Sequence, residues 1–361
     1  QVLNMHKLHH FSGAFAQNDV RFLLNPVNIA MTSVDEKEAL IQSGKAHYSD
    51  LLSQEPAPSQ WHLNLFAKAL QRETPRMANE VQQLSHTLIA QFNNTPIILV
   101  SLVRAGVPLG VMLQRALRDA GKTSFHYGIS IIRDRGIDSA ALEWIENRHG
   151  TQGIVFVDGW TGKGAIRSQL QRSLHGRKGY PPEPKLVVLA DPCGCAWLSA
   201  SDDDWLIPFG IMGAPVSGLI SRSLWSPVGF HGCVQCDHLA DFECGQLLVD
   251  TVDNYRQTLV SAAQIKPDLA QKAKLRRKSE AVVLHLAERY AVDNLNRIKP
   301  GIAEATRAVL RRVPDHVLVR AINDPDVALL MALARDKGIH ISEVGDEIGQ
   351  YRAVTIIKKV F

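Results

Sequence analysis

The sequence contains no apolar run that approaches the roughly 20 residues needed to cross a bilayer. Its first residues do not follow the order of basic, apolar and small residues that a secretory signal shows, and no internal repeat or low-complexity tract is present. With 361 residues and 45% hydrophobic content, the chain can bury a substantial core and divide into more than one domain. We therefore expect a cytoplasmic protein with no membrane partner.

The most informative segment is residues 153–165, GIVFVDGWTGKGA. An apolar run ends in Asp158 and breaks into a turn of small residues, after which residues 166–174 are compatible with a helix. Small residues let consecutive backbone N–H groups converge on an anion, and the N-terminus of a helix adds positive potential. The segment therefore predicts a phosphate loop, residues 158–165, with the acid facing the sugar of a phosphorylated ligand.

Two kinds of phosphate-binding loop share features with this segment. A Walker loop requires G-x-x-x-x-G-K-[ST], and residues 159–164 have neither that spacing nor a hydroxyl after the lysine. The segment instead resembles the loop that binds phosphoribosyl diphosphate (PRPP) in type I phosphoribosyltransferases, with Val157 in place of the first acid of the pattern. The resemblance implies that Asp158 alone bonds the ribose hydroxyls. It also implies a 5-phosphate site formed by Thr161, Gly162, Lys163, Gly164 and Ala165.

A second turn from strand to helix lies upstream. Residues 96–102 are apolar and lead through Arg104 and Gly106 into an apolar helical pattern that ends at Leu117. This turn resembles the pyrophosphate loop of the same enzymes, because a glycine frees backbone N–H groups and a guanidinium can hold phosphate oxygens. In an open parallel sheet both loops would lie at the carboxyl edge near a switch point. The resemblance assigns the leaving diphosphate to a diphosphate loop, Val103, Arg104, Ala105 and Gly106.

Residues 126–138 lie between the two loops and indicate a strand that leads into a charged loop containing glycine. In phosphoribosyltransferases a mobile basic loop covers PRPP, so the resemblance gives this role to Arg133 and Arg135. The alternative is an Arg/Asp-rich turn that stays solvated. The predicted catalytic residues are Asp158, Arg104 and Arg133.

Longer stretches of the chain resemble the bacterial StiP family, which is linked with tellurite-resistance (Ter) stress operons. Family members have been labelled both cysteine protease and orotate-type phosphoribosyltransferase. After Ile207 and Pro208, where the family tends to have a Ser-Cys-Leu-Asn-like stretch, this chain continues with residues 209–213, FGIMG. No cysteine occupies the expected nucleophile position, so this chain lacks the residue on which the protease label depends. The matching stretches are residues 36–49, 101–106, 129–138, 156–166 and 216–222.

The function that these patterns favour is transfer of ribose 5-phosphate from PRPP to a nitrogen acceptor, with release of diphosphate, in a Ter-type stress pathway. Mg²⁺ would bridge diphosphate and ribose oxygens. A non-catalytic regulator that senses PRPP and binds RNA stays open, since Val157 is not acidic. A cysteine protease is the third alternative. The acceptor is not readable from the sequence, and we expect a homodimer.

Basic charge gathers near the end of the sequence. Residues 271–361 hold 17 Lys and Arg against 11 Asp and Glu, a net charge of +6, whereas residues 1–270 have −2. The charge excess is compatible with a solvated linker face or with attraction to nucleic acid, and the pattern at the end of the chain favours the second. Residues 299–357 alternate helical and strand patterns and resemble the Pelota-type RNA-binding domain, with Ala303 where an asparagine is usual. The resemblance implies RNA contacts by Gly301, Glu304, Thr306 and Arg307, and the alternative is a fold kept for packing or dimerisation.

The cysteines offer soft ligands for Zn²⁺ at Cys193, Cys195, Cys233 and Cys236. A C-x-C pair is a poor zinc knuckle, so reduced thiols on loops are the favoured alternative. Arg222 either binds a substrate anion or pairs with a carboxylate.

The predicted fold is a type I phosphoribosyltransferase-like α/β fold, a parallel sheet flanked by helices, with strands near 97–102, 127–132, 153–158 and 185–190. A helical cap, with helices at 35–42 and 60–71, and a small C-terminal α/β domain complete it. The predicted boundaries are 1–75 for the cap, 76–265 for the core, 266–296 for a basic helical linker and 297–361 for the Pelota-like domain.

Overall fold

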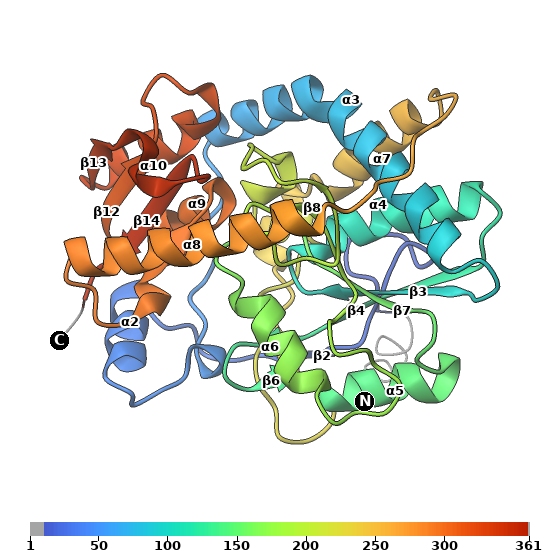
Figure 1. The fold of residues 1–361 in the computed structure, drawn as a ribbon. Helices are drawn as coiled ribbons and strands as arrows, with labels where there is room; N and C mark the ends of the chain where they lie inside the picture. Colours follow the sequence, from blue (N-terminus) through green and yellow to red (C-terminus); the bar gives the residue numbers. More distant parts are fainter. Residues whose placement is uncertain (1–10, 360–361) are drawn as a thin grey trace.

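The fold, taken from a computed structural model that describes residues 11–359, contains a large parallel sheet with helices on both faces and a smaller domain beside it (Figure 1). The large sheet has the order β1-β4-β3-β7-β8-β9, and every neighbouring pair is parallel. This confirms the predicted fold class. The strands are β1 (Arg21–Phe22), β4 (Ser124–Ile129), β3 (Ile97–Leu102), β7 (Ile154–Val157), β8 (Leu186–Ala190) and β9 (Leu198–Ser201).

The central strand β3 is buried along its whole length, which is why its sequence is almost continuously apolar. It pairs with β4 on one side and β7 on the other, so that Val100 lies opposite Tyr127 and Phe156. One face of the sheet carries α3 (Gln60–Gln91), α4 (Gly106–Asp119) and α7 (Gly245–Arg256). The other face carries α5 (Ser139–His149) and α6 (Ala165–Leu174).

The N-terminal segment is joined to the core more closely than predicted. Helix α2 (Val34–Gln42) forms where a helix was expected, but α3 is one helix that continues through Pro75. The predicted boundary at residue 75 therefore falls inside this helix. The reason is that the buried stripe of α3, which includes Phe66, Met77 and Leu88, belongs to a single hydrophobic core on both sides of Pro75. Strand β1 also joins the edge of the large sheet.

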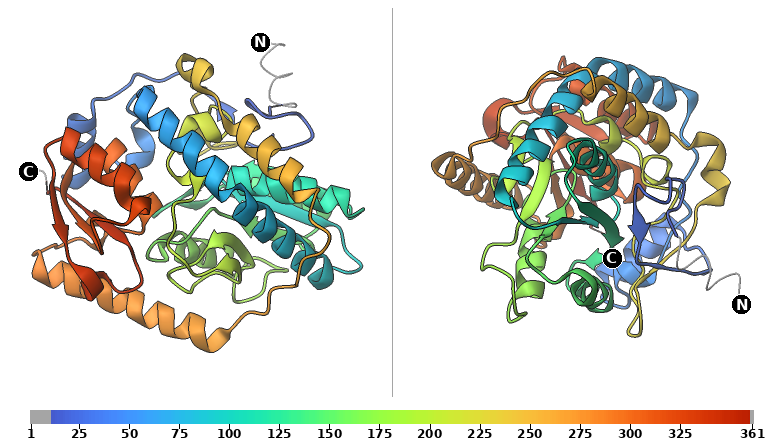
Figure 2. Two further views of the ribbon diagram at one scale, coloured as in Figure 1. Left: turned by 90° about the horizontal axis from the view of Figure 1, so that it is seen from above. Right: turned by 90° about the vertical axis from the view of Figure 1, so that its right-hand side faces the viewer.

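The small domain is a four-stranded sheet with the order β11-β14-β12-β13. Its strands are β11 (Ile298–Pro300), β14 (Ala353–Ile357), β12 (Pro314–Val319) and β13 (His340–Glu343). Helices α9 (Ile302–Arg311) and α10 (Ala328–Asp336) pack against it, and the long α8 (Leu269–Arg289) runs along it in Figure 2. Val283 and Leu286 of α8 share a core with Leu318 and Ile356. The predicted linker helix is therefore part of the domain, because its apolar face needs this sheet to cover it.

Two short ribbons complete the fold. Strand β2 (Asn25–Pro26) pairs with β10 (Gly232–Cys233), and β5 (Ile131–Ile132) pairs with β6 (Gly136–Ile137). The strand predicted at 127–132 is thus divided between β4 and β5. Within residues 11–359, no helix is long and apolar enough to cross a membrane.

Candidate functional site

The two predicted anion loops lie side by side at the carboxyl edge of the large sheet. The diphosphate loop follows β3 and the phosphate loop follows β7, and these strands are neighbours. Their backbones are in close contact, because a Cβ on Gly106 would lie 2.1 Å from the carbonyl oxygen of Val157. A Cβ on Gly159 would lie 3.0 Å from the carbonyl oxygen of Ala105. The chain adds β4 on one side of β3 and β7 on the other, so this edge is a switch point at which ligands bind in open α/β sheets.

Replacing Gly106 by alanine should separate the two loops. The added methyl group meets backbone rather than a flexible side chain, so we expect a loss of about 1–3 kcal/mol in the free energy of unfolding. Binding of inorganic diphosphate, followed by calorimetry, should weaken as well. Gly121→Ala is the control, since its Cβ meets open space and only its positive φ of 75° opposes alanine. Unchanged diphosphate affinity in Gly106→Ala would contradict a role for this contact in binding.

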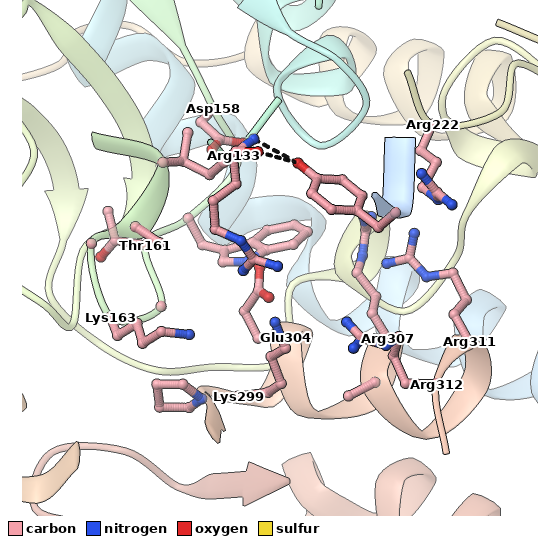
Figure 3. A pocket seen from close by; sticks show the side chains of 18 of the residues that line it. Arg133, Asp158, Thr161, Lys163, Arg222, Lys299, Glu304, Arg307, Arg311 and Arg312 are labelled. Carbon is pink, nitrogen blue, oxygen red and sulfur yellow. Dashed lines mark hydrogen bonds between the residues drawn. The ribbon is translucent and has the colours of Figure 1, made fainter. Parts of the chain in front are cut away.

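A cavity of about 300 Å³ lies between the phosphate loop, α2 and the small domain (Figure 3). We call it the anion cavity because its wall carries nine basic side chains and two carboxylates. The basic residues are Lys37, Arg133, Lys163, Arg167, Arg222, Lys299, Arg307, Arg311 and Arg312, and the acidic ones are Asp158 and Glu304. An adjoining hollow of about 190 Å³ shares Asp158 and Trp160 with it and is lined by Val103, Arg104 and Ala105. The phosphate loop and residues 103–105 of the diphosphate loop therefore line two adjoining hollows, and Gly106 lines neither.

The phosphate loop presents backbone donors to the anion cavity. Helix α6 has no side-chain cap, and its N-cap residue Gly164 has a φ of +87° that favours glycine. In residues 11–359 nothing accepts a hydrogen bond from the backbone N–H groups of Gly162, Lys163 or Gly164. Three consecutive N–H groups at the N-terminus of a helix form a cradle for an anion. The predicted phosphate-site residues 161–165 all line the anion cavity, and Ala165, predicted as part of the loop, is the first residue of α6.

The hydroxyl of Thr161, predicted to contact phosphate, is instead hydrogen-bonded within the protein. Its hydroxyl donates to Asp191 Oδ1 at 2.8 Å and accepts from the Cys193 N–H at 3.3 Å. Asp191 is fully buried and also accepts from Lys272 Nζ at 2.8 Å. The hydroxyl therefore ties the loop to the end of β8, and only the rest of Thr161 lies at the anion cavity.

Asp158 lies at the end of β7, on the walls of both hollows. Its Oδ1 accepts from the Gly159 N–H at 2.8 Å. Burial raises the pKa of this carboxyl to about 7, and the charge of Glu304 adds to the rise, while the Gly159 N–H and Arg307 oppose it. A carboxyl that titrates near neutral pH in a cationic cavity is typical of a functional group.

The basic residues of the anion cavity lie close enough to repel one another. Burial, together with the charges of nearby arginines, lowers the pKa of Lys37 to about 7 and that of Lys163 to about 8. Burial likewise lowers the pKa of Arg222 and Arg307 to about 10, and puts that of Lys299 and Arg311 well below their ordinary values. A bound polyanion would relieve this repulsion, so the cavity is built for negatively charged ligands.

Arg104 lies on the wall of the adjoining hollow, and its charge is already neutralised. Only 3% of its side chain is exposed, and Nη1 lies 2.9 Å from Glu55 Oε1 and donates to the Ile220 carbonyl at 3.3 Å. The Val103–Arg104 peptide bond is cis. The prediction of Arg104 as a freely available diphosphate ligand needs this correction, because Glu55 from the N-terminal segment holds its guanidinium.

The two arginines of the predicted covering loop lie in different places. Arg133 lies in the anion cavity, 5.4 Å above the ring of Tyr48, and its Nε is buried with no partner in residues 11–359 (Figure 3). Its backbone N–H donates to the Tyr48 hydroxyl. Arg135 instead pairs with Asp50 at 2.7 Å and lies 4.4 Å above the ring of Trp225. The structure does not bring Arg135 to the cavity, because these partners hold it elsewhere.

The predicted RNA residues lie at the boundary between the domains. Glu304 Oε1 accepts from Trp160 Nε1 at 3.2 Å, and Arg307 lies 4.8 Å above the Trp160 ring. Thr306 is fully buried and donates to the Ile302 carbonyl at 2.7 Å. Gly301 is buried too, with a φ of +96°. Glu304 and Arg307 therefore line the anion cavity, whereas Gly301 and Thr306 are buried inside the small domain. RNA contact by these four residues stays a prediction.

The cysteines are all buried thiols. Burial raises the pKa of Cys233 and Cys244 to about 12 and of Cys236 to about 11. A hydrogen bond from the Cys195 thiol lowers the pKa of Cys193, whose Sγ lies 3.6 Å from Ser279 Oγ. In the part of the chain that the structure describes, no hydrogen bond joins a cysteine to a histidine, and no three His, Cys, Asp or Glu residues are grouped to hold a metal ion.

Several cavity residues had no assigned role in the sequence analysis. Lys37 and Tyr48 come from the N-terminal segment, and Lys299 and Arg311 from the small domain. Arg222, for which two roles were open, lines the cavity and donates to the Leu51 carbonyl. The resemblance of residues 36–49 and 216–222 to one family was a usable signal for Lys37, Tyr48 and Arg222, but it did not state their role.

Comparisons with known proteins found matches that cover nearly all of the chain. The profile described as "Tellurite-like stress resistance cysteine protease StiP" matches residues 13–253, and "PELOTA RNA binding domain" matches residues 261–359. "Cysteine protease StiP" of Acinetobacter baylyi is 50% identical over 364 residues, covering 97% of this chain and 95% of that protein. The chain belongs to the StiP family. In this StiP family member the anion cavity lies where the StiP and PELOTA regions meet.

Solved structures show a more distant similarity. A mutant hypoxanthine phosphoribosyltransferase from Trypanosoma cruzi, complexed with its product IMP, is 17% identical with a TM-score of 0.28. The match covers 35% of this chain and 66%, just under two thirds, of that one. A second structure of the Trypanosoma cruzi enzyme is 15% identical with a TM-score of 0.30, over 37% and 82% of the two chains. These values assign no activity to the StiP family member.

Proposed function

We propose that this chain binds PRPP and transfers its ribose 5-phosphate to a nitrogen acceptor, releasing diphosphate. The observation that supports this most directly is the cradle of unbonded N–H groups at Gly162, Lys163 and Gly164, next to Asp158 in a cavity with nine basic side chains. PRPP carries phosphate groups on both sides of one ribose. In Figure 3 cations likewise lie toward both ends of the cavity, with Lys163 near Thr161 at one end and Arg307 and Arg311 at the other.

The chemistry asks the protein to stabilise a leaving group. As the bond from C1 to the diphosphate oxygen breaks, negative charge grows on diphosphate and positive charge grows on the ribose ring, and a bond from C1 to the acceptor nitrogen forms. Fixed cations such as Arg307 and Arg311 stabilise the first charge without having to reorganise. Positions held by both domains orient the reactants and exclude water.

Magnesium suits this site as a companion of the substrate. Mg²⁺ prefers oxygen ligands and is usually held by one or two carboxylates together with substrate phosphates. The carboxyl of Asp158, open to the cavity, fits this pattern as the core domain's contribution. When bound, the ion would neutralise charge on the diphosphate.

Two other activities, proteolysis and RNA binding, have less support at the anion cavity. The protease name belongs to the relative and the family description. The cysteines are buried thiols, and within residues 11–359 none of them shares a hydrogen bond with a histidine that could activate it as a nucleophile. The match to a PELOTA domain allows RNA binding, and exposed Lys274, Arg277 and Lys278 on α8 favour RNA as a second ligand. RNA would then meet α8 rather than the cavity.

The assay is release of diphosphate from PRPP with Mg²⁺ and a panel of nitrogen bases. We expect release with at least one acceptor and a loss of about 100-fold or more in Arg133→Met, because this arginine faces the cavity without a carboxylate partner. Arg335→Met on the exposed face of α10 is the control and should match the unchanged chain. Calorimetric binding of PRPP without release across the panel would favour the sensing regulator instead.

A further inference from the structure

The small domain is packed directly on the phosphate loop. Lys163 Nζ donates to the Ile298 carbonyl of β11 at 3.0 Å, and the Tyr351 hydroxyl donates to the Gly162 carbonyl. A Cβ on Gly162 would lie 3.1 Å from Glu304 Cγ. The loop that is proposed to bind phosphate is therefore covered by the domain that carries the RNA-binding resemblance.

Glu304 stands out among the residues that the small domain contributes. It is the second carboxylate on a wall that otherwise carries nine cations. Its Oε1 is bonded to Trp160, whereas Oε2 has no hydrogen-bond partner in the part of the chain described. Burial opposes ionisation, yet Lys299 and the Trp160 N–H hold the pKa of Glu304 below its ordinary value. An ionised carboxylate with a free oxygen thus faces the cavity.

A carboxylate in this position repels phosphate and suits a different part of the ligand. Ionised carboxylates accept hydrogen bonds only, so their partners in a sugar phosphate are the hydroxyl groups. The core domain supplies one such acceptor, Asp158, because its neighbour Val157 is apolar and buried within β7. The charge of Glu304 raises the pKa of Asp158, as expected for two carboxylates that lie close together.

We propose that Glu304 and the neighbouring Asp158 both bind the sugar hydroxyls of the substrate. The small domain would then supply part of the sugar-phosphate site. This inference rests on the proposed binding of a ribose phosphate in the anion cavity. It gives α9 a small-molecule ligand and makes Lys299, Arg307 and Arg311 the phosphate-binding wall opposite the core.

The test compares two probes on the full chain by calorimetry. Ribose 5-phosphate, measured without Mg²⁺, has sugar hydroxyls, whereas inorganic diphosphate has none. In Glu304→Gln we expect about 10-fold or greater weakening for ribose 5-phosphate, since a hydrogen bond to a charged group is lost. Diphosphate should bind equally or more tightly, because a negative charge is removed. Glutamine keeps the acceptor for Trp160, so thermal unfolding should show a folded variant.

The exposed Glu288 on α8 provides the matched control, and Glu288→Gln should bind both probes as the unchanged chain does. Equal ribose 5-phosphate affinity in Glu304→Gln, or equal losses for both probes, would overturn the inference. So would an RNA oligonucleotide that competes with ribose 5-phosphate and loses affinity in Glu304→Gln while the sugar phosphate does not. Ribose 5-phosphate binding that depends on Glu304, together with no diphosphate release from PRPP, would contradict the proposed transfer but support this inference.

Discussion

Asp158→Asn is expected to stabilise the ligand-free chain at pH 8 and to abolish diphosphate release. Burial raises the pKa of Asp158 from its ordinary 3.8 to about 7, so the fold favours the protonated form. The stabilisation from this group is fully present below pH 3.8 and is lost as pH rises through about 7. Asparagine imitates the protonated carboxyl and still accepts from the Gly159 N–H. The expected gain at pH 8 is about 2–4 kcal/mol in the free energy of unfolding.

Denaturant unfolding of both chains between pH 4 and pH 8 measures this effect. The difference between Asp158→Asn and the unchanged chain should grow with pH and level off above about pH 7. Asp336→Asn, at an exposed position at the end of α10, should show no such growth. Equal stabilities at pH 8 would mean that the buried carboxyl carries no cost. A more stable but inactive variant is the pattern expected where a site is shaped for its ligand.

Glu55→Gln is expected to destabilise the chain by about 3–5 kcal/mol at pH 7, because it leaves a buried charge without its partner. Arg104 is 3% exposed, and Glu55 also accepts from the Ala214 N–H at 2.9 Å. Without the carboxylate, Arg104 faces the charges of Arg307 and Arg311. Inorganic diphosphate should restore part of the stability in the variant, since an anion that binds the folded chain can replace the lost charge.

The pH dependence of this pair has the opposite sign to that of Asp158. Burial tends to raise the pKa of Glu55, but Arg104 overcomes it and holds that pKa below its ordinary value of 4.5. Its stabilisation is therefore present above pH 4.5 and is lost as the pH falls through the lower folded value. Denaturant unfolding of Glu55→Gln with and without diphosphate checks both points, with Glu288→Gln as the control. A variant as stable as the unchanged chain at pH 7 would contradict the assignment.

Much of the sheet and of its loops could be predicted because the signals are local. The apolar runs of β3, β7 and β8 and the small residues of the phosphate loop lie next to one another in the sequence. Because parallel strands end at a common edge, their order brings Arg104 and Asp158 to one space without any long-range information. The approach of Gly106 to Val157 follows from the same geometry.

The remaining site residues depend on partners that are distant in the sequence. Thr161 is hydrogen-bonded to Asp191, and Arg135 forms an ion pair with Asp50. The sequence around these residues does not indicate either pairing. A helix such as α9 shows an amphipathic pattern, but the pattern does not tell whether its polar side faces RNA, solvent or the large domain. Glu304 and Arg307 were therefore assigned to RNA, although the fold directs them to Trp160. Lys37, on α2, had no distinguishing context at all.

The placement of β11, α9 and β14 also bears on when the protein becomes competent during its synthesis. A nascent chain that ends after the large sheet has its cradle of N–H groups but lacks Lys299, Glu304, Arg307 and Arg311. A cut between α7 and α8 would likewise separate the two parts of the chain that form the cavity wall. The complete wall of the anion cavity can therefore form only after β11 and α9 have been synthesised.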